Sequence, residues 1–333
     1  MDEKDYVLKI DNLHVKYETD DATVYAVNGI NLVLKRKHTL GIVGETGAGK
    51  TTTGLAIMHL IPSPPGIITD GTITVNGRDI MSLNKNQVSE YRGKEVAMIF
   101  QDPMTSLNPV MTVGDQIAEA ILIHEGVNKK ESEEKAKDML RMVGIPADRY
   151  ADYPHQFSGG MKQRVVIAIA LACKPQILIA DEPTTALDVT IQAQVLALME
   201  DLKQKIETST IMITHDLGIV AETCDEVAVM YAGRIVEQGS IEDVFFHTKH
   251  PYTEGLLNSL PNMNDRHSKL TPIKGLTIDP TVQYTGCAFK ERCPYAKDEC
   301  GNAQDMITVS ENHTVLCGRC KEVDFRLQRN ANG

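Results

Sequence analysis

The sequence has no hydrophobic run long enough to cross a membrane. Its longest uninterrupted apolar stretch, Val165–Cys173, has nine residues, whereas a membrane-spanning helix needs about 20. The first residues, Met1–Asp5, are acidic and polar and do not resemble a secretory signal peptide. These two absences predict a cytoplasmic chain that does not span a bilayer by itself.

Positive charge is also scarce. Lys and Arg total 34 against 45 Asp and Glu, which gives a formal net charge of −11. Such a chain repels a phosphate backbone on average, and its short basic stretches, Lys35–Lys37 and Lys129-Lys130, form no strong patch. The composition therefore argues against nucleic acid as a partner.

The chain is long enough, at 333 residues with 42% hydrophobic residues, for a folded core and an appendage. The part before residue 100 reads as strands and turns around one helix, and a helical insertion follows at about 104–165. Strand and helix patterns then alternate, which is typical of a mostly parallel sheet covered by helices. We predict an α/β fold with a β-rich N-terminal part over residues 1–245, and a loop-rich C-terminal extension, residues 246–333, as a small separate module.

Several elements can be placed from their apolar spacing and their turn residues. Asn128, followed three residues later by Glu131, resembles a capping box, and Gly144 is suited to end the helix that begins there. Strands are expected over Val7–Val15, Leu40–Val43, Gly71–Gly77, Gln176–Ala180, Thr210–Thr214 and Glu226–Tyr231. Helices are expected over Thr51–Leu60, Gln116–Glu125, Glu131–Val143, Val189–Lys205 and Leu217–Thr223.

A glycine-rich stretch, Gly44–Thr51, has the pattern of a phosphate-binding loop: Gly, four residues, then Gly-Lys-Thr. Its glycines allow backbone N–H groups to surround a phosphate, and the helix that follows adds the positive end of its dipole. Lys50 would reach the β- and γ-phosphates, and the Thr51 hydroxyl would bind Mg²⁺. An apolar strand before the loop and a helix after it provide the context that this motif requires.

A second apolar strand lies in Ile177–Glu182 and ends in two carboxylates, Asp181 and Glu182. A strand buried on both faces reads as a continuous apolar run, and ligands bind at the carboxyl ends of parallel strands. Asp181 is suited to hold Mg²⁺ through water, and Glu182 to polarise an attacking water as a base. Together with the phosphate-binding loop, this pair predicts hydrolysis of a nucleoside triphosphate.

Between these two motifs, Ser158-Gly159-Gly160 opens an apolar helix. Ser and Gly at a helix N-terminus can bind an anion, although such a loop alone is common. The stretch that it begins, Ser158–Gln163, ends 17 residues before Ala180-Asp181-Glu182, and this position makes it specific.

The order of these motifs, together with Gln101, Ala186-Leu187-Asp188 and His215, resembles the ATPase subunit of ATP-binding cassette (ABC) transporters over about residues 5–245. The resemblance implies a P-loop NTPase cassette that works as a head-to-tail dimer. Each ATP would lie between the phosphate-binding loop of one subunit and the Ser158 loop of the other. The implied catalytic residues are Glu182, His215 and Gln101, and the implied Mg²⁺ ligands are Thr51, Gln101 and Asp181.

Further residue roles follow from the same resemblance. Tyr17 would stack on adenine, with Tyr25 as a rival aromatic residue and a core position for Tyr17 as the alternative. The departures at Phe157, Met161 and Lys37-His38 remove no group that the chemistry needs. The implied ATP-binding residues are Tyr17, Gly44, Glu45, Thr46, Gly47, Ala48, Gly49, Lys50, Thr51, Thr52, Gln101 and Asp181. The residues implied to contact the ATP of the second subunit are Ser158, Gly159, Gly160 and Gln163, with Asp188 near the dimer interface.

Two further segments, Phe100–Pro109 and His250–Thr253, resemble the dipeptide, oligopeptide and nickel importer subfamily, in particular its D-type ATPases. The resemblance implies a peripheral ATPase on the cytoplasmic face of the membrane that powers uptake of dipeptides or oligopeptides. Its implied partners are a second ABC ATPase, as a heterodimer or a homodimer, two transmembrane permease subunits and, indirectly, a solute-binding protein.

Other functions stay open at this point. The cargo could be nickel or another solute, since membrane and receptor subunits choose it. A soluble iron–sulfur ABC ATPase acting on ribosomes or nucleic acid is a second alternative, against which the single phosphate-binding loop and the negative charge argue. Glu182 and His215 together argue against a scaffold without hydrolysis.

Cysteines are concentrated in one place. Five of the seven lie within Cys287–Cys320, which we call the cysteine segment. A cytoplasmic chain does not keep such thiols as disulfides, so the crowding points to a metal. Three interpretations stay open: thiols without a ligand, a structural zinc site and an iron–sulfur cluster. Only Cys317 and Cys320 have the short spacing usual for zinc, whereas a cluster tolerates wider spacing.

The family resemblance supports the cluster. Peptide-importer ATPases carry a similar pattern, seen here as Gly286-Cys287, Arg292-Cys293-Pro294, Cys300 and His313-x3-Cys317. The implied cofactors are ATP, Mg²⁺ and a 4Fe–4S cluster, with Zn²⁺ as the alternative to the cluster. The implied cluster ligands are Cys287, Cys293, Cys300 and Cys317, with Cys320 as the spare thiol. If the C-terminal extension is independent of the nucleotide-binding part, replacing Cys293 by Ser should release the metal and leave nucleotide binding largely intact.

Overall fold

The computed structural model describes residues 5–185, 187–260 and 272–323, together with 325 and 327. Ala186, the first residue of the expected Ala-Leu-Asp motif, lies outside the described residues. The strands are β1 (Tyr6–Glu18), β2 (Thr23–Lys35), β3 (Thr39–Val43), β4 (Gly66–Val75), β5 (Arg78–Asp79), β6 (Val96–Ile99), β7 (Ile177–Asp181), β8 (Ser209–Ile213), β9 (Glu226–Tyr231), β10 (Arg234–Ser240), β11 (Ile307–Ser310) and β12 (His313–Val315).

The α-helices are α1 (Lys50–Ile57), α2 (Lys85–Lys94), α3 (Pro103–Ser106), α4 (Val113–Glu125), α5 (Lys129–Met142), α6 (Gly159–Leu171), α7 (Val189–Ile206), α8 (Leu217–Thr223), α9 (Ile241–Phe246) and α10 (Pro251–Asn258). Short 3₁₀ turns are η1 (Ile80–Ser82), η2 (Ala147–Ala151), η3 (Pro154–Gln156), η4 (Lys290–Arg292) and η5 (Asp298–Gly301). In the part of the chain that the structure describes, no helix is both long and apolar enough to span a membrane.

The strands form two sheets. β2, β1, β4 and β5 make an antiparallel sheet, and the main sheet has the order β11-β12-β10-β9-β3-β8-β7-β6. Strands β9, β3, β8, β7 and β6 are mutually parallel, so their carboxyl ends meet at one edge. The predicted α/β fold with a β-rich N-terminal part is therefore confirmed.

The main sheet separates two hydrophobic cores. Because successive side chains of a strand face opposite sides, Ile177 and Ile179 of β7 join the core shared with α1 and the antiparallel sheet. Leu178 and Ala180 face the core formed with α4–α7. Burial on both faces explains why β7 reads as an uninterrupted apolar run.

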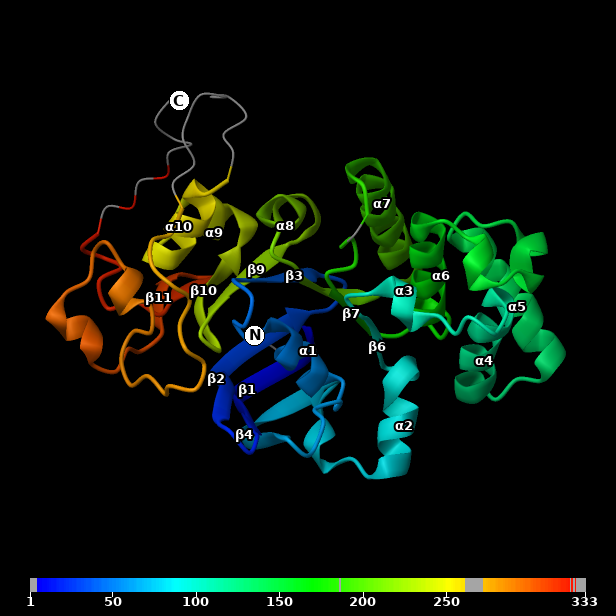
Figure 1. Ribbon diagram of the computed structural model, residues 1–333, viewed down its shortest axis with the longest axis horizontal. Helices are drawn as coiled ribbons and strands as arrows, with labels where there is room; N and C mark the ends of the chain where they lie inside the picture. Colours follow the sequence, from blue (N-terminus) through cyan, green and yellow to red (C-terminus); the bar gives the residue numbers. More distant parts are fainter. Residues whose placement is uncertain (1–4, 186, 261–271, 324, 326, 328–333) are drawn as a thin grey trace.

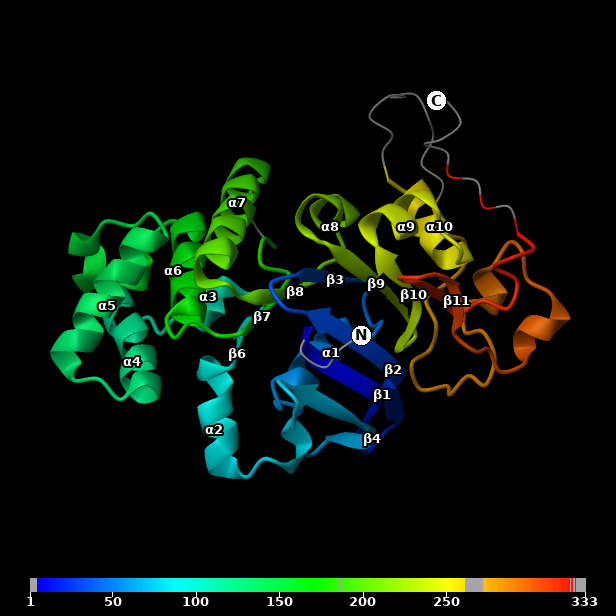
Figure 2. The ribbon, with the colours of Figure 1, turned by 180° about the vertical axis from the view of Figure 1, so that it is seen from behind.

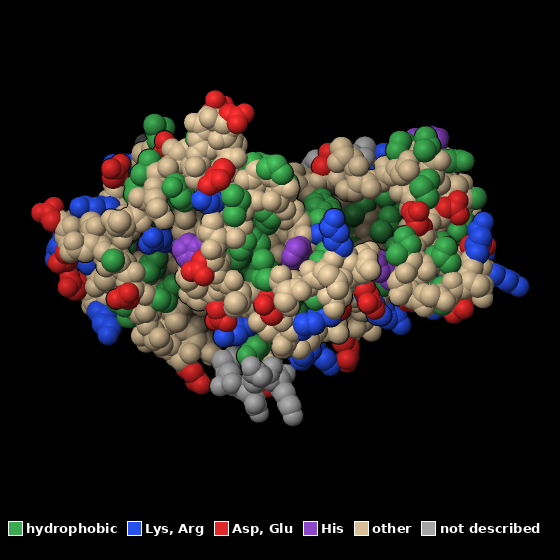
Figure 3. All heavy atoms as spheres, turned by 90° about the horizontal axis from the view of Figure 1, so that it is seen from below, with side chains coloured by type: hydrophobic (Ala, Val, Ile, Leu, Met, Phe, Trp, Pro, Cys, Tyr) green, Lys and Arg blue, Asp and Glu red, His purple; other side chains and the backbone are tan. Residues whose placement is uncertain are grey.

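The elements are arranged in three regions along the molecule (Figure 1). Helices α4 and α5 lie at one end, the cysteine segment lies at the other, and the phosphate-loop helix α1 lies between them, as the reverse view also shows (Figure 2). Acidic and basic side chains are interspersed on the face seen from below, without a continuous basic surface there (Figure 3).

The C-terminal extension packs directly on the rest of the chain. Strand β12 pairs with β10 through Glu237 and Gln238, which continues the main sheet into the extension. Phe289 of the cysteine segment is buried in one core with Tyr231 of β9 and Tyr252 of α10. The division at residue 245 stays a prediction, but the sequence did not indicate how extensively the two parts share a sheet and a core.

Candidate functional site

The phosphate-binding loop runs from the end of β3 into α1. Gly44 and Gly49 have φ angles of 153° and 99°, a region that side chains with a Cβ rarely adopt. A Cβ on Gly44 would lie 2.2 Å from the Met230 carbonyl oxygen, and one on Gly49 would lie 2.3 Å from that of Ala26. Both glycines are therefore required by close backbone approach as well as by the turn.

Lys50 is folded back onto this loop. Its side chain is buried, and Nζ donates hydrogen bonds to the carbonyl oxygens of Gly44 at 2.7 Å and Glu45 at 3.0 Å. Burial lowers the pKa of Lys50, while the nearby carboxylates of Glu182, Asp181 and Glu45 oppose the shift. The ammonium group thus lies within the electrostatic reach of both motifs identified in the sequence.

Asp181 ends β7 beside the same loop. Burial raises the pKa of its carboxyl group, while a hydrogen bond with Thr51 and the charge of Lys50 oppose the shift. A carboxylate and a hydroxyl in contact form an oxygen donor pair of the kind that Mg²⁺ prefers. The structure therefore brings together two of the three predicted Mg²⁺ ligands.

Glu182 is the centre of a hydrogen-bonded group. Its Oε1 lies 2.9 Å from Nδ1 of His215, and its Oε2 accepts hydrogen bonds from Gln101 Nε2 at 2.8 Å and Thr185 Oγ1 at 3.0 Å. Burial raises the pKa of Glu182, but the hydrogen bonds from His215, Gln101 and Thr185 outweigh it, so that the pKa is lowered. The group is a carboxylate at neutral pH and can accept a proton.

The backbone also turns sharply at Glu182. Its φ of 48° lies in the left-handed region, which is uncommon for a residue other than glycine. Its N–H donates to the Ile213 carbonyl oxygen at 2.8 Å, which holds the turn against β8. Strained backbone of this kind persists where neighbours fix it and is concentrated at functional sites.

The Ser158 loop opens α6 in the helical part of the chain. Ser158 is the N-cap and accepts a hydrogen bond from the Met161 N–H at 3.4 Å. Ser158 and Gly159 are exposed, but Gln163 is 0% exposed and donates through Nε2 to the Pro183 carbonyl oxygen at 2.6 Å. Gln163 therefore differs from the expectation that it contacts a second subunit, because its side chain supports the loop after Glu182 from within.

Asp188, which was expected near a dimer interface, lies at the start of α7. Asp188 is exposed and caps α7 by accepting a hydrogen bond from the Ile191 N–H at 3.0 Å.

The Tyr17 hydroxyl lies 3.4 Å from Thr52 Oγ1 of α1. Tyr25 lines a small cavity beside Gly47, and its N–H donates to the Pro280 carbonyl oxygen at 2.9 Å. Both aromatic residues thus lie beside the phosphate-loop region. That Tyr17 rather than Tyr25 stacks on adenine stays a prediction.

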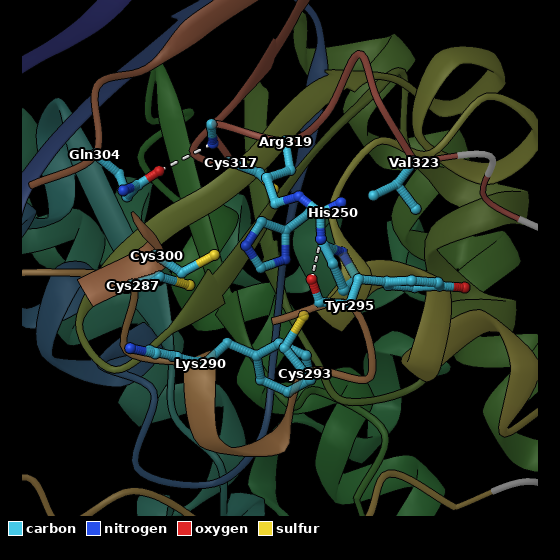
Figure 4. Close-up of a pocket in the computed structure, with 13 residues that line it drawn as sticks. His250, Cys287, Lys290, Cys293, Tyr295, Cys300, Gln304, Cys317, Arg319 and Val323 are labelled. Carbon is cyan, nitrogen blue, oxygen red and sulfur yellow. Dashed lines mark hydrogen bonds between the residues drawn. The ribbon is translucent and has the colours of Figure 1, made fainter. Parts of the chain in front are cut away.

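Four cysteines of the cysteine segment line one cavity. They are Cys287, Cys293, Cys300 and Cys317, and His250 lines the same space (Figure 4). The Cys287 N–H donates to the Cys300 carbonyl oxygen at 2.9 Å, which holds these two residues together. Cys320 is buried but is not among the lining residues.

The thiols surround the cavity without meeting at one point. Throughout the described residues, no three His, Cys, Asp or Glu side chains are grouped so that they could hold a metal ion. All of the cysteines are free, and burial raises the pKa of Cys293 to about 11 and of Cys317 to about 12. Four thiols are the type of donor that an iron–sulfur cluster takes, but as placed in the described residues they do not form a ligand group.

Three residues at this site were not indicated by the sequence. Thr185 reaches Glu182 from the next turn, which its spacing of three residues could have suggested. Arg292 and Tyr252 contact Glu45 of the phosphate-binding loop from the C-terminal extension. No local pattern points to these contacts, since more than 200 residues separate the partners.

Family models match both parts of the chain. One described as "ABC transporter" matches residues 27–185, and one described as "Oligopeptide/dipeptide transporter, C-terminal region" matches residues 236–300. The second match includes three of the four cysteines that line the cavity.

Curated proteins resemble the chain over most of its length. It is 48% identical to the dipeptide transport ATP-binding protein DppD of Bacillus subtilis over 93% of this chain and 94% of that protein. It is 50% identical to the oligopeptide transport ATP-binding protein OppD of the same organism, covering 93% of this chain and 87% of that protein.

Solved structures support the fold. A dimeric ATP-binding cassette in a post-hydrolysis state with ADP and Pi has a TM-score of 0.62 and 25% identity, covering 70% of this chain and 98% of that chain. The protein cbiO1 of Clostridium perfringens, part of an ABC transporter complex, has a TM-score of 0.63 and 29% identity, covering 72% and 91%.

Proposed function

Because the chain belongs to the ATP-binding cassette transporter family, we propose that it is the ATP-hydrolysing subunit of an importer for dipeptides or oligopeptides. The observation that carries this proposal is the likeness of the whole chain to transport ATP-binding proteins for such peptides. The likeness includes the C-terminal region as well as the cassette, so it supports a peptide cargo in addition to ATP hydrolysis.

Different residues of the site are suited to phosphate binding, Mg²⁺ binding and proton transfer. The N–H groups of the phosphate-binding loop and Lys50 hold the phosphates, and Thr51, Asp181 and Gln101 are the residues that would bind Mg²⁺. The bound ion would neutralise charge that develops on the phosphates. Glu182 accepts a proton from the attacking water, while His215 orients its carboxylate and reaches the γ-phosphate.

The proposed working unit is a head-to-tail dimer. Ser158, Gly159 and Gly160 lie at the N-terminus of α6, where backbone N–H groups favour an anion. They would bind the γ-phosphate held by a second ATPase subunit, so that hydrolysis removes the bridge between the subunits. A heterodimer with a related ATPase, two permease subunits and an indirect solute-binding protein complete the proposed importer at the cytoplasmic face of the membrane.

We also propose that Cys287, Cys293, Cys300 and Cys317 hold a 4Fe–4S cluster. The support is that all four line one cavity, whereas Cys320 does not. Four thiolate–iron bonds would cross-link a region made mostly of loops and short turns, which has little core of its own.

The cargo is tested by reconstitution. The chain, its partner ATPase and the permease subunits are placed in liposomes, and uptake of labelled dipeptide, oligopeptide and nickel is followed with ATP hydrolysis. We expect peptide to be transported and to stimulate hydrolysis in the presence of the solute-binding protein. Stimulation by nickel alone would overturn the peptide assignment, and no ATP hydrolysis in any arm would overturn the ATPase assignment.

The cluster is tested by the iron and acid-labile sulfide content of protein purified without oxygen. About four of each per chain are expected, with a brown absorption band. Cys317→Ser should lose iron, whereas the matched variants Cys320→Ser and Cys173→Ser should keep it. One zinc per chain without colour would overturn the cluster.

A further inference from the structure

Glu45 of the phosphate-binding loop is held from three directions. Its carboxylate pairs with Arg292, its N–H donates to the Tyr252 hydroxyl at 2.9 Å, and its carbonyl oxygen accepts a hydrogen bond from Lys50 at 3.0 Å. Two of these three partners belong to the C-terminal extension. The loop that would bind the phosphates is therefore fixed by residues far away in the sequence.

The pair between Arg292 and Glu45 has the geometry of a strong interaction. Nη1 lies 2.8 Å from Oε2, and Nη2 lies 2.9 Å from Oε1, so that the two planar groups meet through two parallel hydrogen bonds. The side chains are 8% and 24% exposed. Bidentate, charge-assisted pairs in such surroundings are stronger and more directional than single hydrogen bonds.

The guanidinium group is itself held firmly. Nε donates to the Lys274 carbonyl oxygen at 3.2 Å, and Nη1 reaches the Tyr231 hydroxyl at 3.3 Å. The guanidinium carbon lies 5.7 Å from the ring centre of Tyr231 and 5.8 Å from that of Phe289. These contacts hold Arg292 in position independently of Glu45. Arg292 therefore places a positive charge at a fixed position beside the loop.

This charge matters because ATP brings several negative charges to the same loop. A free carboxylate on Glu45 would repel the phosphates in partly buried surroundings, where charges are poorly screened. Arg292 neutralises the carboxylate and holds it through both oxygens. The carboxylate of Glu45 also interacts electrostatically with the Lys50 ammonium group. The charge on Glu45 therefore affects the residue that would bind the phosphates.

We infer that Arg292 is a positioning residue for the phosphate-binding loop, through which the cysteine segment sets the affinity for ATP. Arg292 is the last residue of η4 and directly precedes Cys293, which lines the four-cysteine cavity. The position of that backbone therefore determines the position of the guanidinium group. The inference rests on the proposed function, since it concerns binding of ATP by the same loop.

The experiment is a double-mutant cycle on the full chain, read out as the Kd and KM for ATP and as kcat. Arg292→Gln leaves Glu45 unpaired and should raise the Kd and KM on the order of tenfold, with a smaller effect on kcat. Adding Glu45→Gln removes the unpaired carboxylate and should restore most of the lost affinity. Glu45→Gln alone completes the cycle.

The alternative is that Arg292 only holds the extension in place. In that case, Glu45→Gln would not rescue Arg292→Gln, and this outcome would overturn the inference, as would unchanged ATP binding in Arg292→Gln. Lys297→Gln is the matched control, because it removes an equal charge from the same segment at an exposed pair with Glu322. It should leave the Kd unchanged.

Two further arms keep the test decisive. If Arg292→Gln does not fold, Arg292→Lys keeps the charge but loses the two parallel hydrogen bonds, and it should weaken ATP binding by a smaller factor that Glu45→Gln again reduces. Equal ATP affinity of Arg292→Lys and the parent chain would then overturn the inference. Failure of the unmodified chain to bind ATP would instead contradict the proposed function.

Discussion

The carboxylate of Glu182 and the imidazole of His215 are in hydrogen-bond contact, with 2.9 Å between Oε1 and Nδ1. Glu182 is largely buried and His215 is exposed, with side-chain exposures of 15% and 69%. The contact joins two residues that were predicted to act at the same γ-phosphate, although they come from different strand ends.

Glu182→Gln tests the role of the base. The amide keeps the shape but cannot accept the proton of the attacking water, so kcat should fall by at least about 100-fold. ATP binding should be retained and should favour an ATP-held dimer, as measured by light scattering with ATP. Glu134→Gln on the exposed face of α5 is the control. Full hydrolysis by Glu182→Gln would refute the assignment.

The pH dependence of hydrolysis should report the environment of Glu182. Its pKa is lowered, so the base is active above that pKa, and kcat/KM declines as the pH falls through it. His215→Ala removes the largest of the interactions that lower this pKa. The pKa must then rise, and the acidic limb of kcat/KM should move to higher pH.

The control for this shift is His247→Ala, since His247 is exposed on a different element. Its profile should coincide with that of the parent chain. An acidic limb that does not move in His215→Ala would show that this contact does not set the pKa of the base.

Cys293→Ser should affect both metal content and ATP binding. Loss of a cluster ligand should lower the iron content, and the freed backbone should weaken the adjacent contact between Arg292 and Glu45. We therefore expect the Kd for ATP to rise several-fold, measured alongside iron content. This differs from the expectation drawn from the sequence, where the two parts were treated as independent. Unchanged ATP binding in an iron-free variant would restore that expectation.

Glu237 offers a prediction about stability. Its carboxylate is fully buried and accepts hydrogen bonds from Thr248 Oγ1, the N–H groups of Lys249 and His250, and His313 Nε2. Glu237→Ala leaves these buried donors without a partner and should reduce the free energy of unfolding by about 3 kcal/mol. Denaturant unfolding measures the effect, with exposed Glu311→Ala as the control. A loss within the error of that control would contradict it.

The sequence predicted what depends on local pattern. The bounds of α8 and β9 coincide with the prediction, and Asn128 caps α5 by accepting a hydrogen bond from the Glu131 N–H at 3.0 Å. The positions of strands, helix caps and glycine turns depend mainly on residues close in sequence, so a few residues are enough to predict them. The same holds for the phosphate-binding loop and for Asp181, which ends β7, and Glu182, which follows it.

Other features depend on distant residues and were missed. Helix α2 carries little apolar signal, because only Val88 and Tyr91 of its residues are buried. The burial of Gln163 depends on Pro183, and the pairing of Glu45 with Arg292 joins residues 247 positions apart. The pairing of β10 with β12 likewise has no local signature, since it is made by two residue pairs across a long connection.

That pairing also bears on solubility. Without β12, strand β10 would present a row of unpaired N–H and C=O groups, and such an open edge is a template for joining other chains. The outer strand β11 has only four residues, and its three exposed positions are Thr308, Val309 and Ser310, so it is a short border of which two of the three exposed side chains are polar. The C-terminal extension thus covers part of an edge at which other chains could otherwise pair.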